Sequence, residues 1–350
     1  FSVVMVDTTK ENLQRGYEHI TSQYQHAVKK GIMLDEDAED CLSRISLNTD
    51  YQELAKVQLV VEAAFESMQV KIDIFAKLDT VCGSETILAT NTSYLDINKI
   101  AAATTRQQQV VGMHFFSPAN VMKLLEVVRA EATNEQVLAT IIAIGKRLGK
   151  VTVPVGLCYG FVGNRMYACY GREANRLLLE GASPRQIDTA MQSWGMAMGP
   201  LSVADMSGID IGYKSRQENP KQSSDPQYFL VADRLVELGR LGRKTGAGFY
   251  RYDDDRSGDD PMVLELIKQA ASDFSVQRRD IDDEEIQKRL IYALINEGCN
   301  ILQEGIVQSA QAIDAIWLNG YGFPRYRGGP MCYADEVGLE HIISGIEKFH

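Results

Sequence analysis

The sequence predicts an α/β protein in which a Rossmann-like, doubly wound parallel sheet is followed by two related all-α domains. Three observations lead to this prediction. Short runs of β-branched residues alternate with segments of helical periodicity up to Val155, the strand signal then stops, and a set of residue pairs recurs in order in the remainder. A chain of 350 residues also exceeds one ordinary hydrophobic core, so several domains are expected.

The first part of the chain alternates strands with helices. Strands that are continuous apolar runs, separated by helices, are typical of a parallel sheet covered on both faces. Helical spacing of apolar residues is found in segments 10–30, 68–81 and 134–148. The expected strands are residues 3–6, 58–63, 86–89, 109–113 and 151–155.

The second part is predicted to be helical, with interruptions at Gly and Pro clusters. Residues 215–228, rich in Gln, Asn, Ser and Pro, are expected to form a loop, and the acidic stretch 253–260 a linker. The predicted domains are an NAD-binding domain at 1–156 and two helical domains at 157–252 and 261–350.

The two helical segments carry the same residues in the same order, which indicates a duplicated module. Two such copies can pack on each other as the subunits of a homodimer do, so we expect a pseudo-dimer within one chain, and a monomer. Arg165, Glu180-Gly181, Ile187-Asp188, Gly199-Pro200, Ala204-Asp205 and Gly208 recur as Arg289, Glu304-Gly305, Ile313-Asp314, Gly329-Pro330, Ala334-Asp335 and Gly338.

Charge and composition exclude several classes of function. The formal net charge of -11 argues against nucleic-acid and anionic-membrane binding, which use basic surfaces. Six scattered cysteines without a CxxC pair predict a reduced intracellular protein with no disulfide framework and no metal site. No apolar run approaches the roughly 20 residues of a membrane span.

The start of the chain predicts an incomplete dinucleotide site. Asp7 ends the first strand, where an acid in this fold accepts the ribose hydroxyls of NAD and disfavours NADP, although a helix cap is the alternative role. The Gly-rich phosphate turn belongs roughly 20 residues earlier, before residue 1, so we expect the first strand and this loop to be missing by truncation. Gly246-Ala247-Gly248 lacks a third Gly, follows no strand and is interpreted as a turn.

A histidine and a carboxylate carry the predicted chemistry. His114 follows a strand, at the edge where open α/β sheets bind ligands. Glu126 lies in an apolar run and needs a partner, because burying an unpaired carboxylate is costly. A His–Glu pair suits general acid–base catalysis. The alternatives are a core histidine, and a salt bridge of Glu126 with Lys123 or Arg129.

Ordered motifs over essentially the whole chain resemble the 3-hydroxyacyl-CoA dehydrogenase family. The two helical copies make the chain most similar to the dehydrogenase part of bifunctional enzymes, in which a hydratase domain comes first. The motifs are Asn91-Thr92-Ser93, His114-Phe115-Phe116-Ser117-Pro118-Ala119, Met122-Lys123-Leu124-Leu125-Glu126-Val127-Val128, Gly160-Phe161-Val162-Gly163-Asn164-Arg165 and Gly242-Arg243-Lys244-Thr245-Gly246-Ala247-Gly248-Phe249-Tyr250.

The resemblance implies a role for each matching residue at the reaction centre. His114 would take the proton of the substrate 3-hydroxyl, and Glu126 would stabilise the resulting imidazolium. Ser93 would hydrogen-bond the reacting oxygen, and Asn164 would help to hold the substrate. The second copy has Gln287-Lys288-Arg289 at the corresponding place, lacks the Asn, and is expected to be structural.

The resemblance also implies cofactor and CoA contacts. Glu66 and Lys71 match cofactor-contacting positions. The alternative for Glu66 is an acid at a helix N-terminus, and the alternative for Lys71 is a solvated lysine. Ser117 departs from the Asn that is frequent in the family, and Lys30 is either a contact for CoA phosphates or a basic helix end. The cofactor-binding candidates are Asp7, Ala63, Glu66, Lys71, Asn91 and Ser117.

The expected function is NAD-dependent oxidation of L-3-hydroxyacyl-CoA to 3-ketoacyl-CoA in fatty-acid β-oxidation. A dehydrogenase of a free hydroxy or sugar acid and a non-catalytic acyl-CoA-binding module are the alternatives. The resemblance implies an acyl-CoA substrate, a preceding hydratase domain and a thiolase partner. The expected location is the bacterial cytoplasm, with the peroxisome as the alternative, since the final residues Glu347-Lys348-Phe349-His350 are no peroxisomal signal.

Overall fold

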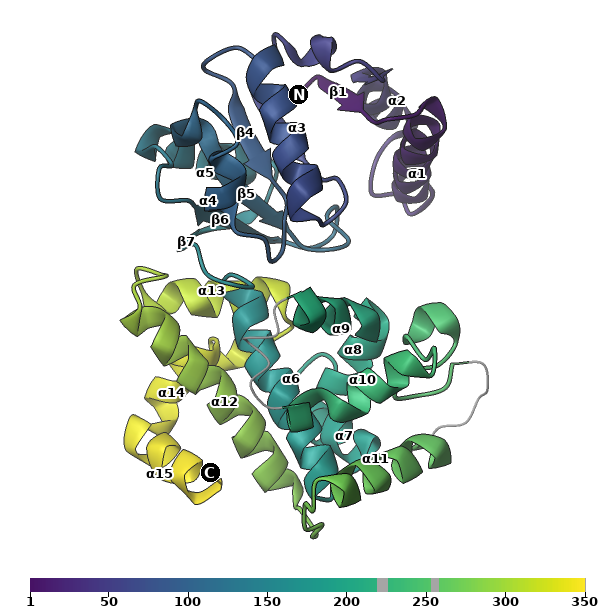
Figure 1. Ribbon diagram of the computed structural model, residues 1–350, viewed down its shortest axis with the longest axis vertical. Coiled ribbons are helices and arrows are strands. Elements are labelled where there is room, and N and C mark those ends of the chain that lie inside the picture. The colour runs from purple at the N-terminus through teal and green to yellow at the C-terminus, as the bar shows by residue number, and fades with distance from the viewer. Residues whose placement is uncertain (219–225, 253–257, 350) are drawn as a thin grey trace. The chain divides into compact units, whose positions relative to one another are not determined.

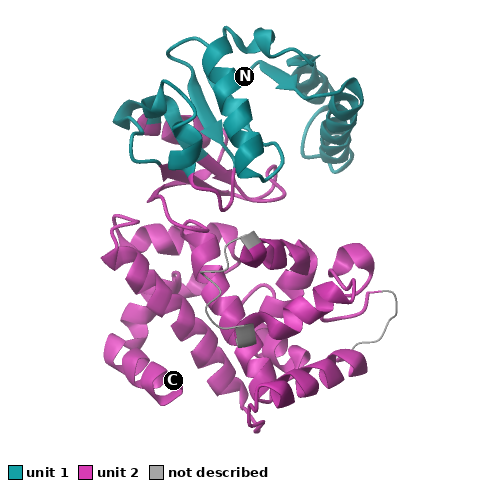
Figure 2. Ribbon diagram, viewed as in Figure 1, with its two compact units in different colours: residues 1–91, 97–112, 130–137 teal, residues 92–96, 113–129, 138–350 magenta. Residues whose placement is uncertain are grey.

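The computed structural model describes residues 1–218, 226–252 and 258–349, and its elements are labelled in Figure 1. It divides into two compact units, shown in Figure 2. Unit 1 comprises 1–91, 97–112 and 130–137, and unit 2 comprises 92–96, 113–129 and 138–350. Unit 2 therefore contains both His114 and Asn164, two residues of the predicted reaction centre.

The first part of the chain is an α/β region, as predicted. Its strands are β1 (Val3–Val6), β2 (Ile45–Asn48), β3 (Leu59–Glu62), β4 (Ile87–Thr90), β5 (Val110–Phe115), β6 (Leu124–Arg129) and β7 (Val151–Gly156). Its helices are α1 (Lys10–Lys29), α2 (Asp35–Ser43), α3 (Met68–Val81), α4 (Ile97–Ala101) and α5 (Glu135–Arg147).

The strands form two sheets. β1 pairs in parallel with β2, and the larger sheet has the order β3-β4-β5-β6-β7, in which β3, β4 and β5 run parallel and β6 runs parallel to β7. The larger sheet holds the core, since β4 is buried along its length and β5 and β6 along all but their last residue. In the doubly wound order a further strand would lie between β1 and β3, and the described residues contain none there.

The second part is helical. The first copy contains α6 (Gly163–Glu180), α7 (Pro184–Trp194), α8 (Pro200–Ser207) and α9 (Ile209–Glu218), with α10 (Leu230–Glu237) following. After α11 (Pro261–Asp273), the second copy contains α12 (Asp283–Gln303), α13 (Ala310–Gly320), α14 (Pro330–Val337) and α15 (Leu339–Phe349). The loop predicted at 215–228 is wrong in part, because α9 continues to Glu218 and residues 226–229 form a 3-10 turn. Residues 219–225, and 253–257 of the predicted linker, lie outside the described part.

The two copies are built by the same local contacts. Asp188 in α7 accepts hydrogen bonds from the N–H groups of Leu201 and Ser202 at 2.9 and 2.8 Å, at the start of α8. Asp314 in α13 accepts from the first N–H groups of α14 in the same way, with Met331 at 2.7 Å. A carboxylate at a helix N-terminus satisfies donors that have no partner inside the helix. The repeated Ile-Asp and Gly-Pro pairs of the sequence are thus two copies of one helix cap.

Glycine is required beside each of these aspartates. A Cβ on Gly199 would lie 2.3 Å from Asp188, and one on Gly329 would lie 2.3 Å from Asp314, which is shorter than any normal contact. The chain passes so close to the capping carboxylate that only a hydrogen fits at this position. This explains why Gly precedes Pro in both copies.

The copies also exchange ion pairs across the packed helices α6 and α12. Arg165 of the first copy binds Glu297 (2.5 Å) and Glu304 (2.6 Å) of the second. In return Arg289 of the second copy binds Glu173 and Glu180 of the first, both at 2.6 Å. Reciprocal contacts between equivalent residues are the mark of a two-fold interface. They support the pseudo-dimer hypothesis.

Candidate active site

His114 and Glu126 meet inside unit 2. The Nδ1 atom of His114 lies 2.7 Å from Oε2 of Glu126, and the two side chains are 5% and 0% exposed. His114 stands near the end of β5 and Glu126 in the middle of β6, and these strands are neighbours in the sheet. The structure therefore brings the predicted pair together, and Glu126 is paired with His114 instead of with Lys123 or Arg129.

The second oxygen of Glu126 is held by a helix N-terminus. The N–H of Gly163, the first residue of α6, donates to Oε1 of Glu126 at 2.9 Å. A helix N-terminus stabilises negative charge through its unpaired N–H groups and its dipole. A proton donated from Nδ1 to the carboxylate of Glu126 leaves the lone pair of His114 on Nε2. This is the arrangement that a general base requires.

Aromatic rings surround the imidazole. The ring centroid of Phe116 lies 4.6 Å from that of His114, and Phe161 lies 5.3 Å away in an edge-on arrangement. Phe161 is fully buried. His114 is thus also a core histidine, so the two readings of this residue are compatible. The rings restrict water around the imidazole, which strengthens its electrostatic interaction with Glu126.

Asn164 and Ser93 are the other predicted residues of this unit. Asn164 follows Gly163 in the first turn of α6, and its Oδ1 accepts a hydrogen bond of 2.8 Å from the hydroxyl of Tyr321. Ser93 follows β4 in the short segment 92–96, which belongs to unit 2 together with His114. Tyr321 belongs to the second copy, directly after α13.

A second buried cluster lies in unit 1. Lys71 of α3 is 1% exposed and donates to both oxygens of Glu62, at 2.9 and 3.0 Å, while Glu66 lies 3.4 Å away. Glu62 also accepts from the hydroxyl of Thr90 at 2.7 Å and from the N–H of Ala64 at 2.6 Å. Reading Lys71 as a solvated lysine is therefore wrong. This network fixes the chain that leaves β3, where Ala63 and Glu66 stand.

The remaining predicted cofactor residues lie near strand ends. Asn91 follows β4 directly, and its N–H donates to the carbonyl of Glu62 at 2.8 Å, so it is tied to the end of β3. Ser117 is exposed in the loop after β5. Lys30 is exposed and caps the C-terminal end of α1, which agrees with a basic helix end and leaves a CoA contact as a proposal.

Asp7 keeps its charge readily. It follows β1 and accepts from the Asn12 side chain at 3.0 Å and from the N–H of Thr8 at 2.6 Å. The hydrogen bond from Asn12 lowers the pKa of Asp7, and burial opposes this only in part. An ionised carboxylate at this strand end fits the ribose hydroxyls of NAD. The residues present thus fit the adenosine side of the cofactor.

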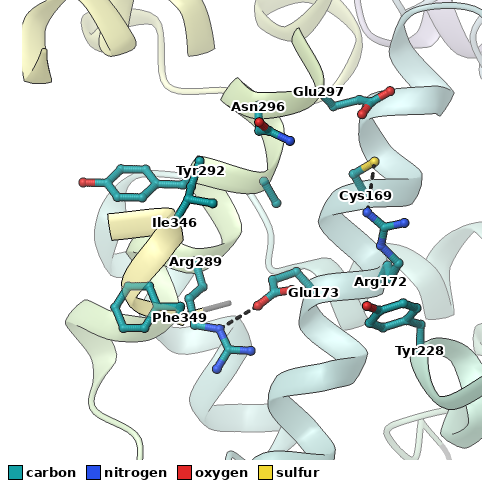
Figure 3. A pocket seen from close by; sticks show the side chains of 11 residues that line it. Cys169, Arg172, Glu173, Tyr228, Arg289, Tyr292, Asn296, Glu297, Ile346 and Phe349 are labelled. Atoms are coloured by element: carbon teal, nitrogen blue, oxygen red, sulfur yellow. Dashed lines mark hydrogen bonds and ion pairs between the residues drawn. The ribbon is translucent and has the colours of Figure 1, made fainter. Parts of the chain in front are cut away.

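A cavity of about 100 Å³ in the helical part is not a second candidate site. Figure 3 shows that it is lined from α6, α12 and α15 and by Tyr228, with Arg289 and Glu173 paired across it. Its charged groups have partners, since Arg289 binds Glu173 and Glu297 binds Arg165, and no predicted site residue borders it. Equivalent residues of the two copies, Glu173 and Glu297 among them, face it, so it is interpreted as a packing gap between the copies.

The described residues also bear on metal binding and on membrane crossing. They contain no group of three or more His, Cys, Asp or Glu side chains that could hold a metal ion. No helix in this described part combines the length and apolar character that a membrane crossing needs.

The sheet is doubly wound, and polar residues that suit a ligand lie at the ends of its strands. Together with a histidine oriented by a carboxylate, this arrangement defines a dinucleotide-dependent oxidoreductase. The family model of the 3-hydroxyacyl-CoA dehydrogenase NAD-binding domain matches residues 1–158, and that of the C-terminal domain matches 160–252 and 286–350. The chain belongs to the 3-hydroxyacyl-CoA dehydrogenase family. Its cofactor is NAD, and its fold is the predicted one.

Relatives and solved structures agree with this assignment. The chain is 41% identical over 365 residues to the peroxisomal bifunctional enzyme of Danio rerio and 35% identical over 355 residues to a peroxisomal fatty acid beta-oxidation multifunctional protein of Arabidopsis thaliana. These matches cover 100% of the chain and 50% and 49% of the two relatives, so the chain spans about half their length.

Among solved structures, 3-hydroxybutyryl-CoA dehydrogenase from Escherichia coli aligns with a TM-score of 0.85 and 27% identity, covering 99% of this chain and 89% of that one. The dehydrogenase part of multifunctional enzyme 1 from C. elegans aligns with a TM-score of 0.63 and 30% identity, covering 92% of this chain and 79% of that one.

Two groups at the site escaped sequence reasoning. Glu62 is a buried strand carboxylate, as Glu126 is, and the same argument from a carboxylate in an apolar run would have found it. Tyr321 is separated from Asn164 by 157 positions, and no local pattern connects them.

Proposed function

We propose that this chain oxidises L-3-hydroxyacyl-CoA to 3-ketoacyl-CoA with NAD in fatty-acid β-oxidation. The observation that carries the proposal is the buried His114–Glu126 pair, whose carboxylate is anchored on the first N–H of α6. Binding alone does not require an oriented imidazole, whereas removal of a hydroxyl proton does.

In this mechanism Nε2 of His114 takes the proton from the substrate 3-hydroxyl. Glu126 stabilises the imidazolium that forms, since its charge lies 2.7 Å from Nδ1. Ser93 hydrogen-bonds the reacting oxygen, and Asn164 holds the substrate from the start of α6. NAD, when bound, supplies the acceptor for the hydride that leaves carbon 3.

Most of the cofactor contacts in this proposal come from unit 1. Asp7 accepts the adenosine ribose hydroxyls, and Ala63, Glu66 and Asn91 contact the cofactor at the ends of β3 and β4. Lys71 acts through the carboxylates of Glu62 and Glu66, because its ammonium is buried between them. The other contacts proposed are Ser117 for the cofactor and Lys30 for the CoA phosphates.

The relatives support proposals for one partner domain and for the location. Because the chain corresponds to about half of bifunctional proteins, we propose that a hydratase domain precedes it in a longer protein. The peroxisomal names of the relatives favour the peroxisome over the bacterial cytoplasm. A thiolase partner remains a proposal from the family resemblance.

The test is reduction of acetoacetyl-CoA with NADH by the longer protein that contains this chain. We expect His114→Ala and Glu126→Gln to lower turnover by about 10²–10⁴-fold, the size of general-base catalysis. His341→Ala is the matched control, since His341 is an exposed histidine of α15.

Near-normal turnover by His114→Ala would refute the mechanism. The alternatives give other outcomes. Turnover that CoA analogues do not inhibit favours a dehydrogenase of free hydroxy acids, and tight binding of acyl-CoA without turnover favours a non-catalytic module.

A further inference from the structure

Tyr321 belongs to the second helical copy but lies at the reaction centre of the first. It follows Gly320, the last residue of α13, and its ring stacks on Trp317 with centroids 4.7 Å apart. Trp317 is fully buried, so this stack is rigid. On its other sides the ring meets Phe116 at 5.5 Å and Tyr167 at 5.8 Å. The tyrosine therefore has one well-defined position.

That position is directly over the start of α6. A Cβ on Gly163 would lie 2.4 Å from both a ring carbon and the hydroxyl oxygen of Tyr321. Glycine at this position therefore serves two contacts. Its N–H reaches Glu126, and its missing side chain admits the ring of Tyr321.

The hydroxyl of Tyr321 determines which way the Asn164 amide faces. It donates to Oδ1 of Asn164 at 2.8 Å. Burial raises the pKa of Tyr321 well above its ordinary value, so the hydroxyl remains protonated and donates. An amide whose oxygen accepts this bond must turn its NH₂ group the other way. Asn164 then offers two N–H donors, which suit the carbonyl oxygens of an acyl thioester.

The same aromatic cluster reaches the base. Phe116 contacts both Tyr321 and His114, at 5.5 and 4.6 Å between ring centroids. The second copy thus reaches the imidazole of His114 through the ring of Phe116, and the amide of Asn164 through one hydrogen bond from Tyr321.

We propose that Tyr321 is a positioning residue, by which the second helical copy orients the Asn164 amide so that its N–H groups face the acyl-CoA substrate. This inference rests on the proposed function and deepens it. The second copy lacks its own Asn but supplies the hydroxyl that orients the Asn of the first.

The experiment removes the hydroxyl and keeps the ring. Tyr321→Phe should lower kcat/KM for acetoacetyl-CoA by about tenfold, the value of one hydrogen bond near the top of its usual range. The unfolding midpoint should fall by no more than the loss of one hydrogen bond explains, because the aromatic stack remains, and the Kd of NADH should stay at the parent value. Tyr326→Phe is the matched control, since it removes another hydroxyl that reaches from the second copy to the first, at the Trp194 carbonyl.

A double-mutant cycle separates orientation from other effects. In an Asn164→Ala background, Tyr321→Phe should cause no further loss, because the hydroxyl acts only through Asn164. Parent-like kcat/KM in Tyr321→Phe, or a full additional loss in the double variant, would overturn the proposal. Loss of the proposed function itself would be recognised separately, by normal turnover in His114→Ala.

Discussion

The reciprocal ion pairs between the two helical copies permit a sharp prediction, because equivalent residues occupy unequal environments. Arg289 is 1% exposed and faces Glu173, which is 6% exposed, and Glu180. Its counterpart Arg165 is 21% exposed and faces Glu304, which is 50% exposed. Replacing each arginine by Met keeps much of the apolar stem and removes the charge.

The cost should differ strongly between the two sites. Arg289→Met leaves Glu173 buried without its cation, and breaking a buried pair in this way costs about 3–5 kcal/mol. Arg165→Met leaves carboxylates that water reaches more readily, and its cost should be about 1–2 kcal/mol, between the surface and buried cases. We therefore expect Arg289→Met to be at least about 1 kcal/mol more destabilising.

The assay is urea unfolding followed by tryptophan fluorescence. This chain contains two tryptophans, Trp194 in the first copy and Trp317 in the second, so their fluorescence reports on the helical copies. Arg185→Met is the control, because Arg185 is exposed in α7 and should change stability by no more than about 0.5 kcal/mol.

Equal losses for Arg289→Met and Arg165→Met, or a larger loss for Arg165→Met, would contradict the burial argument. A second check is Glu173→Gln in the Arg289→Met background. It should recover part of the stability, because it removes the charge that was left unpaired.

Three further predictions concern titration and capping. Burial raises the pKa of Glu180, but the hydrogen bonds and charge of Arg289 and its neighbours outweigh this and lower the pKa. The contribution of Glu180 to the free energy of unfolding is therefore present at neutral pH and is lost below about pH 4.5. Arg289→Met should flatten the loss of stability between pH 6 and pH 3, and an unchanged slope would contradict this. Burial raises the pKa of Cys158 to about 11; iodoacetamide at pH 8 should therefore modify the exposed Cys332 well before Cys158, as peptide mass spectrometry can show. Asp314→Ala should cost about 1–2 kcal/mol in urea unfolding, because the side-chain oxygen that caps α14 is removed, and a neutral result would refute the capping role.

The elements that the sequence predicted correctly are those with a clear apolar pattern. α2 was missed because its nine residues carry a single buried side chain, Ala38, and show no apolar face. β2 was missed because it is short and half of it is exposed. β6 was not recognised as a strand because Glu126 interrupts its apolar run, and the partner that makes this burial tolerable lies on β5.

The site could be predicted where chemistry leaves a local trace. A carboxylate among Leu and Val pointed to a partner, and His114 is that partner. The helix N-terminus that holds Glu126 could not be predicted, because the donor is the backbone N–H of Gly163, 37 positions away, and a backbone donor has no side-chain signature. Tyr321 could not be predicted for a different reason: its donor is a side-chain hydroxyl, but its partner depends on how the two copies pack.

The covalent joining of the two copies has a consequence for how each can change. In a homodimer every substitution appears on both sides of the symmetry axis, and dilution can separate the subunits. Here the copies stay at a fixed effective concentration, and a substitution affects one side only. Asn164 and Lys288 stand at equivalent places, as do the partly exposed Arg165 and the buried Arg289. One half could thus specialise as the support, while the other retained the chemistry.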